Sequence, residues 1–230
     1  MIRTVSLGPK VAVQCTDPLT PPRDLLERIE TLWQESLQDT GRRLFNGVCH
    51  SLVEFDGERI VLQPIDYKLL IANRSDPEIE SRLPLRPLGV TGLSLCRDGI
   101  VLGKRSGELA LNGGLWEAAP SGGLDKPDPE AVLFEELLEE LGLEPGTVRT
   151  RELVGLVEDT DSGEADLVFK LALDVGRSHV VSAHGRNATL EYDDIAIVPV
   201  ENLARFLAST DALLPALEPM LRLGGLLRTT

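Results

Sequence analysis

The hydrophobic pattern divides the chain into two parts that meet near residue 87. In the first part, short apolar runs bounded by Gly, Pro and Asp predict three strands and one helix. The strands are expected over residues 5–14, 48–55 and 59–65, and the helix over residues 21–41, ending at Gly41. Asp56-Gly57 between the last two runs is a hairpin signal. Residues 1–87 are therefore predicted to form a small α+β extension.

The second part, residues 88–230, alternates strands and helices more tightly. Strands are expected over residues 90–97, 100–107, 151–159, 165–175 and 195–200, and helices over residues 201–208 and 211–222. The first two strands are joined by Asp98-Gly99, which suits a type I′ hairpin turn. Together these elements predict an α/β fold in which helices cover both faces of a mixed sheet.

An acidic helix lies between the second and third of these strands. Asp128 is expected as its N-cap and Pro129 as its first residue. At about 100° per residue, Glu136, Glu139 and Glu140 share one face. The opposite face, which is expected to pack on a core, carries Phe134, Leu137, Leu138 and Leu141.

Two of these acids stand at the unfavourable end of the helix. Glu139 and Glu140 lie in the last turn before Gly142, where the negative end of the helix dipole disfavours carboxylates. A divalent cation would turn the cluster into a binding site, because Mg²⁺ takes oxygen ligands and keeps water or substrate in its shell. The alternative is a solvated amphipathic helix, because Glu is a good helix former. The Pro-Ser-Gly-Gly loop directly before the helix favours the site.

Residues 120–143 resemble the Nudix box, whose pattern is Gly-x5-Glu-x7-Arg-Glu-aliphatic-x-Glu-Glu-x-Gly-aliphatic. The second half is matched without a gap by Glu136, Leu137, Glu139, Glu140, Gly142 and Leu143. The first half departs at its arginine, first glutamate and glycine, which are Glu135, Pro127 and Ser121 here. A loop one residue shorter would bring Gly123 to the glycine position. Arg105 or Lys126 would have to replace the arginine, which in the family orients a metal-binding glutamate.

The resemblance implies a Nudix-type α/β/α sandwich over residues 88–230, including a C-terminal helix, behind the extension of residues 1–87. It also implies hydrolysis of a pyrophosphate bond in a nucleoside diphosphate joined to another moiety. Glu136, Glu139 and Glu140 are the expected metal ligands, with Mg²⁺ as the cofactor and Mn²⁺ as the other option. Glu140 and Glu136 are accordingly also expected to be catalytic.

The general base is expected from an acidic segment just before a strand, as in some family members. Glu191 is the first choice there, ahead of Asp193 and Asp194. A solvated loop is the alternative interpretation of this segment.

Four residues are expected to contact the substrate. Gly122 and Gly123 would let the backbone approach metal or phosphate without a Cβ in the way. Arg105 is the candidate phosphate clamp, because its guanidinium can hold two oxygens; an exposed strand-end arginine is the alternative. Trp116, which precedes the glycine loop, would stack on a base, or else anchor a core.

Short matches in the extension suggest a substrate class. They are RLFNG at 43–47, DYKLL at 66–70 and PLGV at 87–90, which look similar to features of long Nudix hydrolases acting on UDP-glucose and related UDP-sugars. ADP-ribose is the alternative substrate. A noncatalytic Nudix-fold module that binds a nucleotide or a partner protein is the alternative function, and the paired acids Glu139 and Glu140 argue against it.

The composition of the chain limits the kinds of partner that the protein is expected to bind. A formal net charge of -14 over 230 residues argues against a nucleic-acid-binding surface, because such binding needs clustered Lys and Arg. The three cysteines are too few for a disulfide framework, and no apolar run approaches the roughly 20 residues of a membrane span. We therefore expect a cytoplasmic protein without membrane partners. The resemblance also admits a homodimer.

Overall fold

A large mixed sheet forms the centre of the computed structural model, which describes residues 1–7, 11–38, 44–109, 112–187 and 191–227. Its main strand order is β1-β9-β10-β5-β6-β11, with β7 paired to β6 and β8 paired to β5. The strands are β1 (Ile2–Ser6), β5 (Leu88–Cys96), β6 (Gly99–Arg105), β7 (Trp116–Ala118), β8 (Ser121–Gly123), β9 (Val148–Asp159), β10 (Ala165–Leu173) and β11 (Tyr192–Val198). Among these pairs, β10 and β5 run parallel and the others antiparallel.

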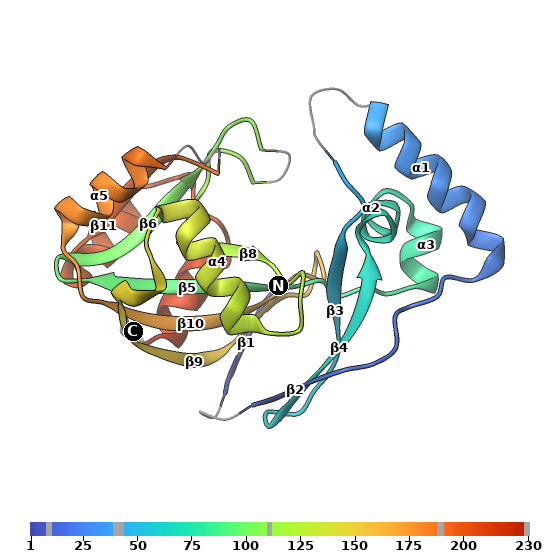
Figure 1. The fold of residues 1–230 in the computed structure, drawn as a ribbon, viewed down its shortest axis with the longest axis horizontal. Helices are drawn as coiled ribbons and strands as arrows, with labels where there is room; N and C mark the ends of the chain where they lie inside the picture. The colour runs from blue at the N-terminus through green and yellow to red at the C-terminus, as the bar shows by residue number, and fades with distance from the viewer. Residues whose placement is uncertain (8–10, 39–43, 110–111, 188–190, 228–230) are drawn as a thin grey trace.

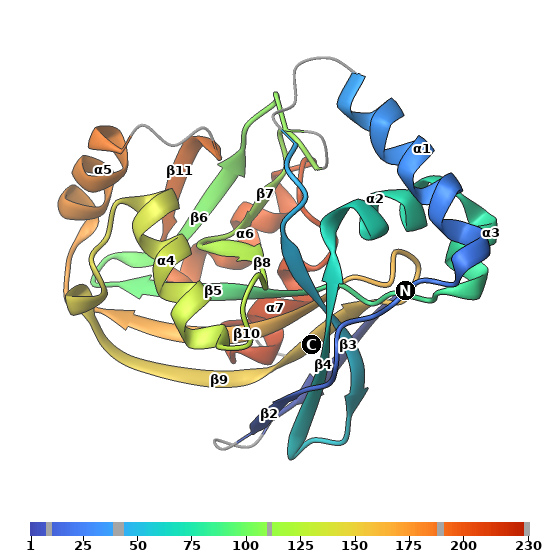
Figure 2. The same ribbon diagram turned by 45° about the vertical axis from the view of Figure 1, so that its right-hand side comes forward.

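Helices cover both faces of this sheet, as the sequence predicts. One face carries α4 (Pro129–Leu141) and α5 (Arg177–Arg186), and the other carries α6 (Leu203–Ala208) and α7 (Leu217–Leu223). Figure 2 shows α4 in front of the sheet and the red C-terminal helices behind it. Each face has its own cluster of buried apolar side chains. The α/β/α sandwich is therefore confirmed.

The extension contains a second sheet in the order β2-β4-β3. Its strands are β2 (Ala12–Cys15), β3 (Val48–Phe55) and β4 (Arg59–Asp66), and its helices are α1 (Leu26–Gln38), α2 (Tyr67–Ser75) and α3 (Pro77–Arg82). These elements stand beside the large sheet in Figure 1. The helices pack around buried Ile29, Leu69 and Ile79. Gly41, the expected helix end, lies outside the described residues.

The single strand expected over residues 5–14 is wrong. The structure has two strands there, and they belong to different sheets: β1 pairs with β9 of the large sheet, whereas β2 pairs with β4. Gly8-Pro9, a turn signal in the sequence, separates them. In addition, Leu52, Ile60 and Leu62 of the extension are buried in the same cluster as residues of α4. The extension thus packs directly on the sandwich, and the division at residues 87 and 88 stays a prediction.

Two local expectations need correction, and some helices were not expected. The β5–β6 hairpin forms, but Gly99 pairs with Cys96, so that Arg97 and Asp98 make the turn. Neither has the positive φ that a type I′ turn requires. The last helix begins at Leu217 instead of residue 211, and helices α2, α3 and α5 were not expected.

None of the described helices is both long and apolar enough to cross a membrane.

Candidate active site

Helix α4 brings the predicted acids to the sheet. Asp128 caps it by accepting hydrogen bonds from the amides of Glu130 and Ala131, both at 3.1 Å. Gly142 ends it with a φ of 66°, in the left-handed region that favours glycine. The predicted start and end of this helix are therefore confirmed.

The buried face of α4 is rotated from the expected one. Leu138, which was expected to pack, is 41% exposed, whereas Glu140 is only 3% exposed. Val132 and Leu133 are also buried. The buried face of the helix is therefore centred closer to Glu140 than the sequence pattern predicted. Glu139 remains exposed, so the three acids share a direction but differ strongly in burial.

The Glu140 carboxylate is held by two donors. Its Oε2 accepts a hydrogen bond from the amide of Ser121 at 2.9 Å and one from the Tyr192 hydroxyl at 3.0 Å. Burial raises the pKa of Glu140 well above its ordinary value, although the Ser121 hydrogen bond opposes this shift. Glu140 thus links α4 to β8 and β11 inside the protein.

Arg105 lies between two carboxylates. Its Nη1 bonds Glu117 at 2.7 Å and its Nη2 pairs with Glu191 at 3.1 Å. The side chains of Arg105 and Glu117 are only 18% and 4% exposed, so this is a largely buried ion pair. Glu117 was not a candidate from the sequence, where its only signal is an acid between Trp116 and Ala118 in a short apolar run. The predicted phosphate clamp is therefore already engaged with protein carboxylates.

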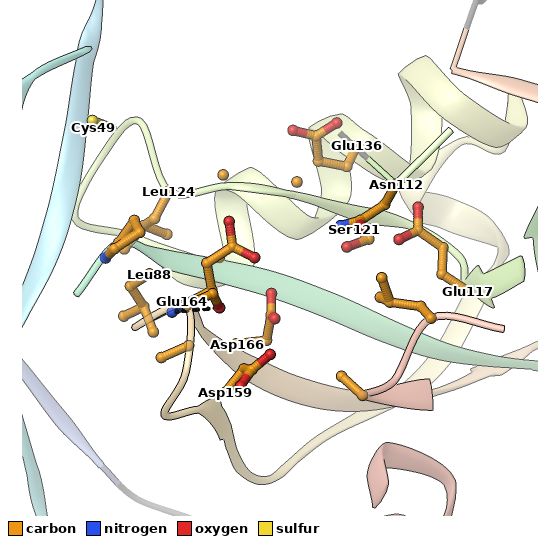
Figure 3. Close-up of a pocket in the computed structure, with 18 of the residues that line it drawn as sticks. Cys49, Leu88, Asn112, Glu117, Ser121, Leu124, Glu136, Asp159, Glu164 and Asp166 are labelled. Carbon is orange, nitrogen blue, oxygen red and sulfur yellow. Dashed lines mark hydrogen bonds between the residues drawn. The ribbon is translucent and has the colours of Figure 1, made fainter. Parts of the chain in front are cut away.

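A cavity of about 680 Å³ brings most of the predicted residues together. Glu136, Glu139, Glu140, Glu191, Arg105, Gly122 and Gly123 line it. Trp116 is not among its described lining residues; its ring packs edge-to-face on Phe206 with the centroids 5.6 Å apart. The base-stacking role of Trp116 therefore has no support from its position, which is that of a core anchor. Figure 3 labels Glu136 of α4 and Glu117 of β7 among the side chains that line the cavity.

Gly122 explains how Glu136 is placed. A Cβ at Gly122 would overlap the Glu136 carboxylate, so the glycine leaves room for that side chain to lie against the loop. At Gly123 a Cβ would meet nothing within 4 Å. The group that approaches the Gly122 backbone in this structure is thus the Glu136 carboxylate, where the sequence had suggested a metal or a phosphate.

Negative charge accumulates in the cavity. The pKa of Glu136 is raised to about 7, first by burial and then by repulsion from Glu139 and Glu191. Asp166 of β10, which the sequence did not single out, also has its pKa raised to about 7, by burial and by repulsion from Glu164 and Glu117. In Figure 3, Asp166 and Glu164 lie on the β10 side of the cavity, apart from Glu136.

A divalent cation fits this donor set chemically. The side chains are carboxylates, which Mg²⁺ and Mn²⁺ prefer, and a cation would relieve the burial and repulsion that raise the pKa of Glu136. Within the described part of the chain, no three His, Cys, Asp or Glu side chains already converge on one point. Glu140 is tied to Ser121 and Tyr192, so cation binding requires side-chain adjustment within the cluster.

Asp166→Asn should flatten the dependence of stability on pH. Because the pKa of Asp166 is about 7 in the folded protein and lower when unfolded, its contribution to stability is lost as pH rises from about 4 to 7. The substitution should raise the free energy of unfolding at pH 8 by about 2 kcal/mol, roughly half of what the full shift gives, because Asp166 is only partly buried and solvent screens its charge. Urea denaturation between pH 4 and 8 measures this.

Asp193→Asn is the matched control for that experiment. The amide of Gly107 lowers the pKa of the exposed Asp193, so this substitution should reduce stability at neutral pH and change little at low pH. If the free energy of unfolding of Asp166→Asn differed from that of wild type by the same amount at every pH, the raised pKa of Asp166 would be contradicted.

No protein-family model and no curated protein matches this chain. DR0079 from Deinococcus radiodurans superposes with a TM-score of 0.51 and 18% identity, covering 75% of this chain and 97% of that one. The NUDIX domain of Shewanella oneidensis NrtR complexed with ADP ribose gives a TM-score of 0.45 and 16% identity, covering 65% and 91%.

A bifunctional NMN adenylyltransferase/ADP ribose pyrophosphatase from Francisella tularensis is also similar, with a TM-score of 0.46 and 16% identity over 68% of this chain and 47% of that one. At such identities the likeness concerns the fold alone. The fold shared with DR0079 is the α/β/α sandwich described above.

Proposed function

We propose that this protein is a metal-dependent Nudix-type hydrolase that cleaves a pyrophosphate bond in a nucleoside diphosphate joined to another moiety. The observation that carries the proposal is the placement of Glu136 and Glu140 on α4, directly against the Ser121–Gly123 strand and at the wall of a 680 Å³ cavity. A carboxylate that is buried at the wall of a cavity and has a raised pKa is typical of functional sites.

Glu136, Glu139 and Glu140 would hold Mg²⁺, with Mn²⁺ as the other option. When bound, such a cation neutralises the diphosphate and supplies an activated water. Around it, Ser121 and Tyr192 keep the Glu140 carboxylate in a fixed orientation. The Gly122-Gly123 loop leaves space beside Glu136.

Arg105 and Glu191 would act together on the substrate. Arg105 uses Nη1 for Glu117 and Nη2 for Glu191, and the Glu191 carboxylate also lines the cavity. A substrate phosphate can compete for Nη2 while Nη1 stays on Glu117, which orients the guanidinium. Glu191, released from Arg105, would then accept a proton from the attacking water.

The substrate we propose is a nucleotide sugar of the UDP-glucose type. The extension supplies part of the cavity wall through Val48, Cys49, Tyr67, Leu70 and Arg74, and two of these belong to the DYKLL run at 66–70. An aromatic and aliphatic wall beside a diphosphate site suits a nucleoside or a sugar ring. ADP-ribose is the alternative within the same class.

A noncatalytic nucleotide-binding module is the second candidate function. It is favoured by Glu135 and Pro127 at two box positions and by the lack of a converged cluster of three ligands among the described residues. Such a module would bind the same nucleotides without turnover.

Phosphate release, read through a coupled phosphatase, separates these functions. UDP-glucose, ADP-ribose, other nucleotide sugars, dinucleotides and nucleoside triphosphates are tested with Mg²⁺, Mn²⁺ or EDTA. We expect metal-dependent cleavage of a nucleotide sugar that EDTA abolishes. A silent panel combined with thermal stabilisation by one of the nucleotides would establish the binding module instead.

A further inference from the structure

The residue at the arginine position of the Nudix box does not contact the candidate site. This residue is Glu135, which is exposed on the surface of α4 and accepts a hydrogen bond from Lys126 in the loop before the helix. Neither side chain contacts Glu140 through any hydrogen bond among the described residues. The orientation of the Glu140 carboxylate must therefore come from elsewhere.

Tyr192, at the start of β11, is the side chain that reaches Glu140. It is 4% exposed, and its hydroxyl lies 3.0 Å from Glu140 Oε2 and 3.2 Å from Glu117 Oε1. A hydroxyl has one proton to donate. Because Arg105 already donates to Glu117 at 2.7 Å, the proton of Tyr192 is directed to Glu140, the nearer acceptor.

The local backbone is adapted to this placement of the ring. Gly103 on β6 lies beneath it, and a Cβ there would come within 2.5–2.6 Å of three ring atoms. The pairing of β11 with β6 also shifts register between Tyr192 and Asp194. Such irregularities re-aim side chains at the rims of sheets. Glycine and register shift together let Tyr192 enter the space between two carboxylates.

We propose that Tyr192 is a positioning residue, whose hydroxyl and the amide of Ser121 together orient the Glu140 carboxylate for cation binding. On the other side of the hydroxyl, Arg105 donates to Glu117, so that Glu117 competes less for the Tyr192 proton. The cation-binding part of this inference rests on the proposed function. Tyr192 itself acts only through Glu140.

Two variants separate the hydroxyl from the ring. Tyr192→Phe removes the hydroxyl and keeps the packing, whereas Gly103→Ala displaces the ring and keeps the hydroxyl. Lys126→Ala, which breaks the exposed pair with Glu135, is the control. The first readout is the thermal shift that Mg²⁺ or Mn²⁺ alone produces, without substrate. The second is the metal concentration that gives half-maximal hydrolysis.

We expect both site variants to need about tenfold more metal for half-maximal response, as is typical when a partner of a metal ligand is removed. The KM for the nucleotide at saturating metal should stay unchanged, and Lys126→Ala should match wild type. A lower melting temperature with an unchanged metal response would reduce Tyr192 to a packing role and overturn the proposal.

The metal-only readout keeps the two proposals apart. If wild type responds to metal but hydrolyses nothing in the substrate panel, the proposed hydrolase fails, while the comparison of thermal shifts still decides the role of Tyr192. If the wild-type protein shows no thermal response to either cation, the positioning role is overturned as well.

Discussion

Glu140→Gln is expected to lower kcat about a thousandfold, equivalent to about 4 kcal/mol in the activation barrier. The carboxylate charge is what a cation needs from this position, and the amide removes it. The fold should persist, because the Gln side-chain oxygen can accept the same hydrogen bonds from Ser121 and Tyr192. Thermal stability without metal should equal or exceed that of wild type, because burial disfavours the charged form of Glu140.

Steady-state kinetics at saturating metal, together with circular dichroism and thermal melts, checks this prediction. Glu135→Gln is the matched control, because it neutralises a carboxylate on the same helix that is exposed and outside the cavity. Wild-type turnover in Glu140→Gln would remove Glu140 from the proposed cation site, whatever substrate is used.

The parts of the fold that could be predicted from sequence are those with strong local signals. Asp128, Pro129 and Gly142 mark the ends of α4, and they do so because capping involves only neighbouring residues. Helix α5 was missed because its sequence buries only Val180 and Ala183 and alternates them with polar residues. Its position depends on packing beside α4, which no local pattern encodes.

In the candidate site, too, contacts between residues close in sequence could be predicted, and contacts between distant residues could not. Glu136 and Glu140 lie four residues apart on one helix, so their proximity follows from the helical period. Tyr192 and Glu117 meet Glu140 only through strand pairing: the contacts of Tyr192 with these acids span 52 and 75 residues of sequence. The sequence offered no reason to connect them. Asp166 was missed for the same reason, because the parallel pairing of β10 with β5 brings it to the cavity.

The burial of Glu117 and its pairing with Arg105 are connected by electrostatics. The cavity wall contains many more carboxylates than guanidinium groups among its described residues, and Arg105 is the cation nearest the buried Glu117. Its positive charge opposes the burial that raises the pKa of Glu117. Arg105 therefore stabilises the buried Glu117 carboxylate in the absence of substrate.

Arg105→Met should reduce the free energy of unfolding by about 3 kcal/mol, because it leaves Glu117 buried without its ion-pair partner. Met retains much of the side-chain volume, so the loss reports mainly on the uncompensated carboxylate. Urea denaturation without substrate measures it. Glu117→Gln introduced into this variant should restore most of the stability, because a neutral amide tolerates burial.

Wild type, the single variants Arg105→Met and Glu117→Gln, and the double variant together also test the phosphate clamp. A clamp that is purely a substrate contact predicts a raised KM for Arg105→Met with unfolding unchanged from wild type. We expect Arg105→Met both to raise KM and to lower stability. Most of the stability loss should disappear in the double variant, while the raised KM should persist because the guanidinium is still missing. Recovery of KM together with stability in the double variant would show that Arg105 only organises the wall, and that another group binds the phosphate.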